Sequence, residues 1–126
     1  MFFAAVLAIA ATVAATEVRF DPVYNTAGES TDVVACSNLA AKFPTFKSFP
    51  TFPSIGGSDV ITGFADADCG TCFNVTFNGT SQLFTGIDVA GDGIVTSQTS
   101  FGRFANTDVG QFNASVVKVS KSLCGM

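Results

Sequence analysis

Four cysteines, Cys36, Cys69, Cys72 and Cys124, constrain the fold more than any other feature of this chain. The middle two form the motif Cys69-Gly-Thr-Cys72. An even cysteine count in a short exported chain predicts a disulfide framework. The same motif in a cytosolic protein would indicate a redox or zinc site. A zinc site made from all four remains formally open, although the second close pair of such sites is missing.

Residues 1–15, MFFAAVLAIAATVAA, form an uncharged and almost wholly apolar segment. They are too few to span a bilayer, which takes about 20 apolar residues. Cleavage after Ala15 would place Val13 and Ala15 at the −3 and −1 positions, so the segment predicts a secretory signal peptide without a basic n-region. A buried first helix is the alternative. Charges begin at Glu17, and we expect residues 16–126 to be one secreted, extracellular domain.

The chain carries six basic and ten acidic residues, no histidine and a net charge of −4. Lack of histidine excludes His-dependent catalytic triads and His-ligated metals. An acidic chain with scattered cations has no electrostatic footprint for nucleic acid or anionic lipid, so we expect neutral partners such as glycans. The stretch Asp88–Gly93 superficially resembles a calcium loop. Ala90 and Thr99 stand where ligands should be, so a turn is predicted there, with no metal and no cofactor.

The pattern beyond the leader is mainly β. Alternating or β-branched runs predict strands at 18–21, 31–36, 73–77, 83–89 and 115–120. Asn78-Gly79 is favoured turn chemistry for a hairpin between the third and fourth runs. Short helices are predicted at 39–43, behind a Ser37-Asn38 cap, and at 97–104, capped by Ser97. Residues 43–59 are rich in Pro and Gly and predict a loop that packs some of its phenylalanines on the core. Short strands with few helices favour a β-barrel or sandwich.

Candidate catalytic carboxylates are few. A glycosidase needs two of them flanking the scissile bond, yet Glu17 and Glu29 are the only glutamates and lie in charged or turn-like surroundings. Most aspartates occupy turn-forming positions. Asp88 differs, because it follows Gly86-Ile87 at a predicted strand end and precedes a glycine-rich loop. It is therefore the candidate that faces a groove.

Six short motifs follow one another along the chain: Thr16-Glu-Val-Arg-Phe-Asp-Pro-Val-Tyr24, Ala35-Cys-Ser-Asn38, Phe43-Pro-Thr45, Phe52-Pro-Ser-Ile-Gly-Gly57, Cys69-Gly-Thr-Cys-Phe73 and Gly86-Ile-Asp88. In their order and spacing, and over essentially all of residues 16–126, the chain resembles the cerato-platanin family of small secreted fungal proteins. The resemblance implies a mainly β fold, a six-stranded double-ψ β-barrel with short helices and two disulfides, related to the first domain of expansins. It also implies the pairings Cys36–Cys69 and Cys72–Cys124, one of three possible connectivities.

Family members bind chitin oligosaccharides in a shallow groove, loosen cellulosic material without hydrolysis, and are perceived by plants as elicitors. The resemblance places the groove aspartate at Asp88, with Ser37, Asn38 and Tyr24 matching motif positions near it. This chain departs from the family in three ways. Leu39 follows the Ser-Asn motif in a shortened loop, phenylalanine replaces the frequent tryptophans at Phe64 and Phe73, and the loop after Asp88 lacks a basic residue.

Three sequons are present, Asn74-Val-Thr76, Asn78-Gly-Thr80 and Asn113-Ala-Ser115, and all three are glycosylation candidates. Asn78 lies in a predicted turn and is the best candidate. We expect one or two of the three to be used.

These observations predict a monomeric, non-catalytic cell-wall protein that binds chitin or N-acetylglucosamine oligosaccharides, with expansin-like loosening and a plant or host immune receptor as a further partner. The alternatives are a weak glucan hydrolase of double-ψ barrel type and a surface-active structural cell-wall protein. The second is suggested by 14 phenylalanines, all but two of them beyond the leader. Asp88→Ala is predicted to weaken chitin-oligomer binding about tenfold at a nearly unchanged melting temperature, with Asp66→Ala as its control.

Overall fold

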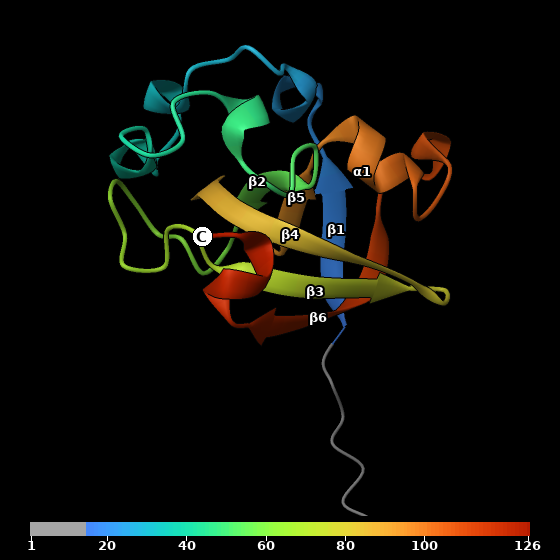
Figure 1. Cartoon of the computed structure of the whole chain (residues 1–126). Helices are drawn as coiled ribbons and strands as arrows, with labels where there is room; N and C mark the ends of the chain where they lie inside the picture. Colours follow the sequence, from blue (N-terminus) through green and yellow to red (C-terminus); the bar gives the residue numbers. More distant parts are fainter. Residues whose placement is uncertain (1–14) are drawn as a thin grey trace, which may run out of the picture.

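A computed structural model describes residues 15–126, so the predicted signal peptide at 1–15 lies, but for its last residue, outside the described residues. The fold is a closed six-stranded barrel with the strand order β1-β5-β2-β4-β3-β6 (Figure 1). The strands are β1 (Thr16–Phe20), β2 (Ile55–Ser58), β3 (Cys72–Phe77), β4 (Thr80–Val89), β5 (Ile94–Thr96) and β6 (Phe112–Val119). The pairs β1–β5 and β2–β4 are parallel, and the other four are antiparallel. The predicted barrel is confirmed.

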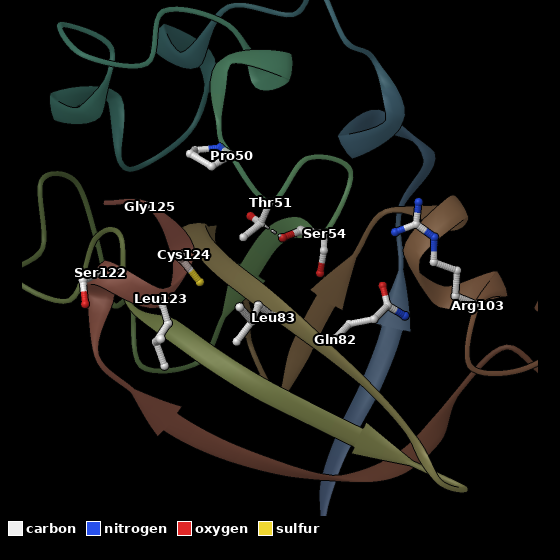
Figure 2. A pocket seen from close by; sticks show the side chains of 10 residues that line it. All are labelled: Pro50, Thr51, Ser54, Gln82, Leu83, Arg103, Ser122, Leu123, Cys124 and Gly125. Carbon is white, nitrogen blue, oxygen red and sulfur yellow. Dashed lines mark hydrogen bonds between the residues drawn. The ribbon is translucent and has the colours of Figure 1, made fainter.

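Within the described residues, helical structure is confined to short turns outside the barrel wall. These are η1 (Pro22–Asn25), η2 (Thr31–Val33), η3 (Ser37–Leu39), η4 (Phe46–Ser48), α1 (Gln98–Gly102), η5 (Thr107–Val109) and η6 (Lys121–Cys124). Residues 21–54 wind over one end of the barrel (Figure 1), and η6 lies beside β3 and β4, across a groove from residues 50–54 (Figure 2). None of the helices within residues 15–126 is long and apolar enough to cross a membrane.

The predicted hairpin is confirmed as β3 and β4. Its turn residues Asn78 and Gly79 have φ of +50° and +81°, a conformation that Asn and Gly adopt more readily than other residues. The predicted helix at 97–104 forms as the shorter α1, and the Ser97 side chain accepts a hydrogen bond from the Ser100 N–H at 3.0 Å.

The strand predicted at 31–36 is wrong, because η2 occupies its first half. Ser30 caps this turn by accepting a hydrogen bond from the Asp32 N–H, and the Thr31 hydroxyl donates to the Phe43 carbonyl. These local hydrogen bonds outweigh the weak β propensity of the run. The helix predicted at 39–43 is also displaced, since η3 spans Ser37–Leu39 and therefore contains the residues that were expected to cap it.

Strand β2 was missed because Gly56-Gly57 in a Pro-rich segment predicts a loop. Gly56 is required where β2 passes close to β5, and Gly57 where β2 passes close to Val89 of β4. Gly56 has a φ of +156°, and a Cβ atom there would lie 1.9 Å from the Val95 carbonyl oxygen. A glycine pair in a strand can thus mark a close approach of two backbones rather than the end of the strand.

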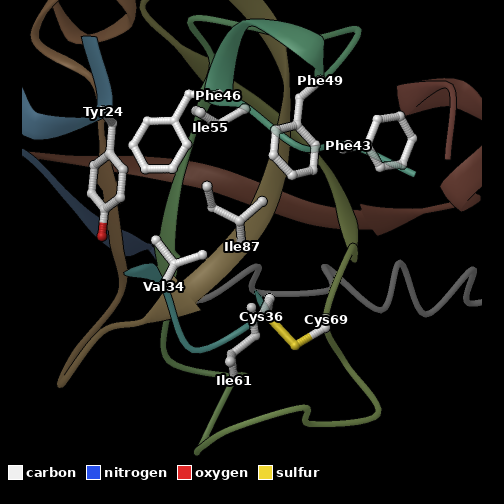
Figure 3. Close-up of a cluster of buried hydrophobic side chains, with 10 residues drawn as sticks. All are labelled: Tyr24, Val34, Cys36, Phe43, Phe46, Phe49, Ile55, Ile61, Cys69 and Ile87. Carbon is white, nitrogen blue, oxygen red and sulfur yellow. A yellow bond between two sulfur atoms is a disulfide. The ribbon is translucent and has the colours of Figure 1, made fainter. Parts of the chain in front are cut away.

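Two hydrophobic clusters form the core. One lies between the covering segment 21–54 and the barrel and includes Tyr24, Phe43, Phe46, Phe49 and Ile87 (Figure 3). Its Phe43 and Phe49 rings stack with centroids 4.9 Å apart. The other fills the barrel around Phe84, Phe101 and Phe112. The prediction that loop phenylalanines pack on the core is therefore confirmed.

Both disulfides pair as the family resemblance implies. Cys36–Cys69 closes a separation of 33 residues and Cys72–Cys124 one of 52. The described residues contain no free cysteine. Chain-entropy arithmetic for loops of these lengths gives an upper estimate of about 4 kcal/mol for each bond.

Candidate functional site

Asp88 joins three segments of the chain at the end of β4. One carboxylate oxygen accepts a hydrogen bond from the Tyr24 hydroxyl at 2.9 Å. The other accepts from the backbone N–H of Ala35 at 3.1 Å and from that of Val89 at 2.9 Å. We call these four residues, Asp88, Tyr24, Ala35 and Val89, the Asp88 node. Asp88 is half-buried, and both oxygens of its carboxylate hold the covering segment to the barrel.

The position of Asp88 follows from the strand pairing. The parallel register between β2 and β4 shifts between Gly56 and Gly57, so that Gly57 lies opposite Asp88. Such a bulge redirects the side chains of a strand and is common beside functional sites. Tyr24 reaches the carboxylate from η1, a turn that Asp21 caps by accepting the Val23 N–H.

Burial dominates the electrostatics of Tyr24. Loss of solvent, and then the negative charge and hydrogen bond of Asp88, raise the pKa of Tyr24 above its ordinary value of 10.0. The phenol therefore keeps its proton and acts as a hydrogen-bond donor toward Asp88. Its ring lies within the first hydrophobic cluster, with its centroid 6.1 Å from that of Phe46 (Figure 3).

The other two predicted site residues lie close along the chain but point elsewhere. Backbone contact continues past Ala35, because the Cys36 N–H donates to the Ile87 carbonyl at 3.1 Å. Within residues 15–126, however, no hydrogen bond joins the side chain of Ser37 or Asn38 to the node. Asn38 is exposed and lines a separate hollow of about 270 Å³, beside Leu39, Lys42, Phe43, Gly70 and Met126 among others. The structure brings Tyr24 and Asp88 together and leaves Asn38 in that hollow.

A groove of about 480 Å³ opens on another side of the barrel (Figure 2). It is lined by Pro50, Thr51, Ser54, Gln82, Leu83, Arg103, Ser122, Leu123, Cys124 and Gly125. Gln82 is held on its floor, because its amide donates to the Ser100 carbonyl and accepts from the Ser100 hydroxyl, both at 3.0 Å. Sequence reasoning missed this groove, since its walls come from four segments that no motif connects. No residue of the Asp88 node lines it.

The three sequons differ in accessibility. Asn78 is exposed in the β3–β4 turn and Asn113 is exposed on β6. Asn74 is half-buried in the middle of β3, where it lies between Leu83 of β4 and Val117 of β6.

Comparison with known proteins relates the whole described domain to one family. The family model described as Cerato-platanin matches residues 16–126. Cerato-platanin of Ceratocystis fimbriata f. sp. platani is 36% identical over 126 residues, covering 94% of this chain and 93% of the relative. Allergen Asp f 15 of Aspergillus fumigatus is 32% identical over 114 residues, covering 85% and 75%.

Solved structures agree. The crystal structure of cerato-platanin 2 from M. perniciosa superposes with a TM-score of 0.84 at 37% identity, covering 89% of this chain and 99% of that one. The solution structure of the fungal elicitor Cerato-Platanin gives a TM-score of 0.77 at 36% identity, covering 86% and 95%.

Proposed function

Since this chain belongs to the cerato-platanin family, we propose that it is a secreted, non-catalytic cell-wall protein that binds chitin or related N-acetylglucosamine oligosaccharides around Asp88. The observation that carries the proposal is the fixed, half-buried carboxylate. A carboxylate offers about four acceptor positions, and three are occupied by Tyr24, Ala35 and Val89. The remaining capacity is available to a sugar hydroxyl or an acetamide N–H.

The charge balance supports an uncharged ligand. Ten acidic residues against six basic ones disfavour nucleic acid and anionic lipid at long range. An oligosaccharide of N-acetylglucosamine is neutral and meets no such barrier. Two intramolecular disulfides suit a secreted protein, because such bonds persist in oxidising compartments.

Wall loosening and recognition by plants belong to the same proposal. The solved relative described as a fungal elicitor supports an elicitor role, with a plant receptor as the partner. Binding without cleavage would loosen contacts between wall polymers. A reducing-sugar assay on swollen cellulose tests the hydrolase alternative, because release of reducing ends by the oxidised protein would overturn the non-catalytic proposal. A surface-tension measurement tests the surface-active alternative, because a strong fall in the surface tension of water would favour it.

The binding test is calorimetric titration of the oxidised protein with a chitin hexamer. Asp88→Asn is the informative variant. Its amide oxygen can still accept from Ala35 and Val89, and its NH₂ can donate to the Tyr24 oxygen, so the node keeps three contacts although the Tyr24 hydroxyl proton loses its acceptor. We expect affinity to fall about tenfold, which corresponds to about 1.4 kcal/mol, because a charge-assisted hydrogen bond becomes a neutral one.

The structure changes the earlier expectation for Asp88→Ala. Removing the carboxylate leaves the buried Tyr24 hydroxyl without its acceptor, at a cost of roughly 1–3 kcal/mol, so the melting temperature should fall. Asp66 is no longer a neutral control, since its carboxylate accepts hydrogen bonds from Thr62 and Asp68. Asp108→Asn replaces it as the exposed match. Equal binding by Asp88→Asn and the native protein would remove Asp88 from the site, and loss of binding in Arg103→Ala would move the site to the groove of Figure 2.

A further inference from the structure

Several segments that bear exposed apolar side chains meet at the Asp88 node. The described residues include eight large hydrophobic side chains that are exposed, and four of them belong to segments that meet at this node. We call these four the apolar rim: Val23, Val33, Phe64 and Val89. Two of them are chain neighbours of Tyr24 and Asp88 themselves, and a third lies two residues before Ala35. Half of the exposed apolar side chains thus lie on segments that are joined, directly or through Ala35, to one half-buried carboxylate.

Phe64 is the largest and most exposed member of the rim, at 79% exposure. It reaches the node through its neighbour Ala65, whose backbone N–H donates to the Ala35 carbonyl at 3.0 Å. The Ala35 N–H in turn donates to the Asp88 carboxylate at 3.1 Å. One residue, Ala35, therefore connects the loop that bears Phe64 to the carboxylate.

The loop that bears Phe64 is held in one shape. One oxygen of Asp66 accepts from both the backbone N–H and the hydroxyl of Thr62, at 3.0 and 2.7 Å. Ala65 adopts a φ of +53°, which non-glycine residues seldom do. The disulfide from Cys69 to Cys36 fixes the same loop from its far end. An exposed ring on such a loop loses little conformational entropy when a ligand covers it.

An exposed aromatic face and a fixed carboxylate offer the two kinds of contact that a sugar ring can make. A pyranose presents C–H groups on its faces and hydroxyl or acetamide groups on its edge. Small-ligand sites generally combine apolar walls with a few fixed polar groups in this way.

We propose that Phe64 is the stacking residue of the glycan surface, with its ring against the face of one pyranose while Asp88 accepts hydrogen bonds from the polar edge of the bound chain. This inference rests on the proposed function and assigns the aromatic contact of the bound sugar to it.

The chain contains no tryptophan, so Phe64→Trp introduces a single indole that reports on this position alone. Adding chitin hexamer should shift or quench its fluorescence. Calorimetric titration should show binding at least as tight as in the native protein for Phe64→Trp and five- to tenfold weaker binding for Phe64→Ala. Leu123→Ala, at a residue 58% exposed in the groove of Figure 2, should bind as the native protein does. Melting temperatures should be unchanged in Phe64→Ala, since the ring is not buried.

The outcomes separate the two proposals. Normal binding by Phe64→Ala, or indole fluorescence that ignores the hexamer, while Asp88→Asn is weakened, overturns the stacking assignment and leaves the glycan site in place. Absence of hexamer binding by the native protein overturns the proposed function, and the stacking assignment with it.

Discussion

Alkaline titration of Tyr24 gives a direct measurement of the Asp88 node. The chain contains one tyrosine and no tryptophan, so its ultraviolet phenolate absorbance comes from Tyr24 alone. Burial and the Asp88 charge raise the pKa of Tyr24 in the folded protein above 10.0. We therefore expect the folded protein to show no phenolate absorbance between pH 10 and 11. A denatured sample should show it, because its tyrosine loses its proton in this range.

The same shift makes stability depend on pH. Below pH 10 the phenol is protonated in both states, and its contribution to stability is fully present. Above pH 10 the unfolded chain releases the proton and the folded chain keeps it, so the free energy of unfolding falls by about 1.4 kcal/mol for each pH unit. At pH 11 the melting temperature should be lower by roughly 5 °C in a domain of this size.

Tyr24→Phe is the control for this pH dependence. It loses the hydrogen bond to Asp88, which costs about 1 kcal/mol at neutral pH, but it has no phenol to ionise. Its stability should therefore approach that of the native protein as the pH rises from 10 to 11. Both disulfides are closed and the described residues hold no free thiol to start exchange. Ordinary titration of Tyr24 near pH 10 in the folded protein would refute the argument.

Three further expectations concern the scaffold. Gly56→Ala should prevent folding, because its Cβ would collide with the β5 backbone. Gly28→Ala is the control and should fold normally, since a Cβ there has nothing within 4 Å. Secretion yield and circular dichroism distinguish the two variants, and a folded Gly56→Ala protein would contradict the close approach. Replacing Cys36 and Cys69 together by serine should lower the free energy of unfolding by up to about 4 kcal/mol in guanidinium titration, and an unchanged midpoint would contradict the estimate. Asn78→Asp keeps the turn chemistry and should remove a glycan mass when the protein is secreted from a eukaryotic host; an identical mass would show that the sequon is unused.

Sequence patterns predicted the elements whose signals are local. The β3–β4 hairpin is set by residue alternation and by Asn78-Gly79, and α1 by its Ser97 cap. Prediction failed where tertiary contacts decide. Gly56 belongs to a strand because β5 passes too close for any side chain, and residues 31–36 turn because side chains satisfy the backbone locally.

The site was predictable only in part. Asp88 was identified from its place after a strand and before a glycine-rich loop, and the family motifs added Tyr24. The role of Ala35 was not predictable, since a backbone N–H carries no sequence signal. The family resemblance marked Phe64 only as a phenylalanine in place of a frequent tryptophan. Its significance depends on its exposure and on the Ala65–Ala35 hydrogen bond, which joins residues 30 positions apart.

Strand β6 closes the barrel, because it pairs with β1 on one side and β3 on the other. Its partners β1 and β3 begin at residues 16 and 72. During synthesis, β1 therefore cannot pair with β6 until nearly the whole chain has been made. A chain truncated before residue 112 would carry two unpaired strand edges, which are templates for intermolecular pairing. Nascent chains should therefore need protection from aggregation until their last fifteen or so residues emerge, and folding should be slow relative to helical domains of the same length.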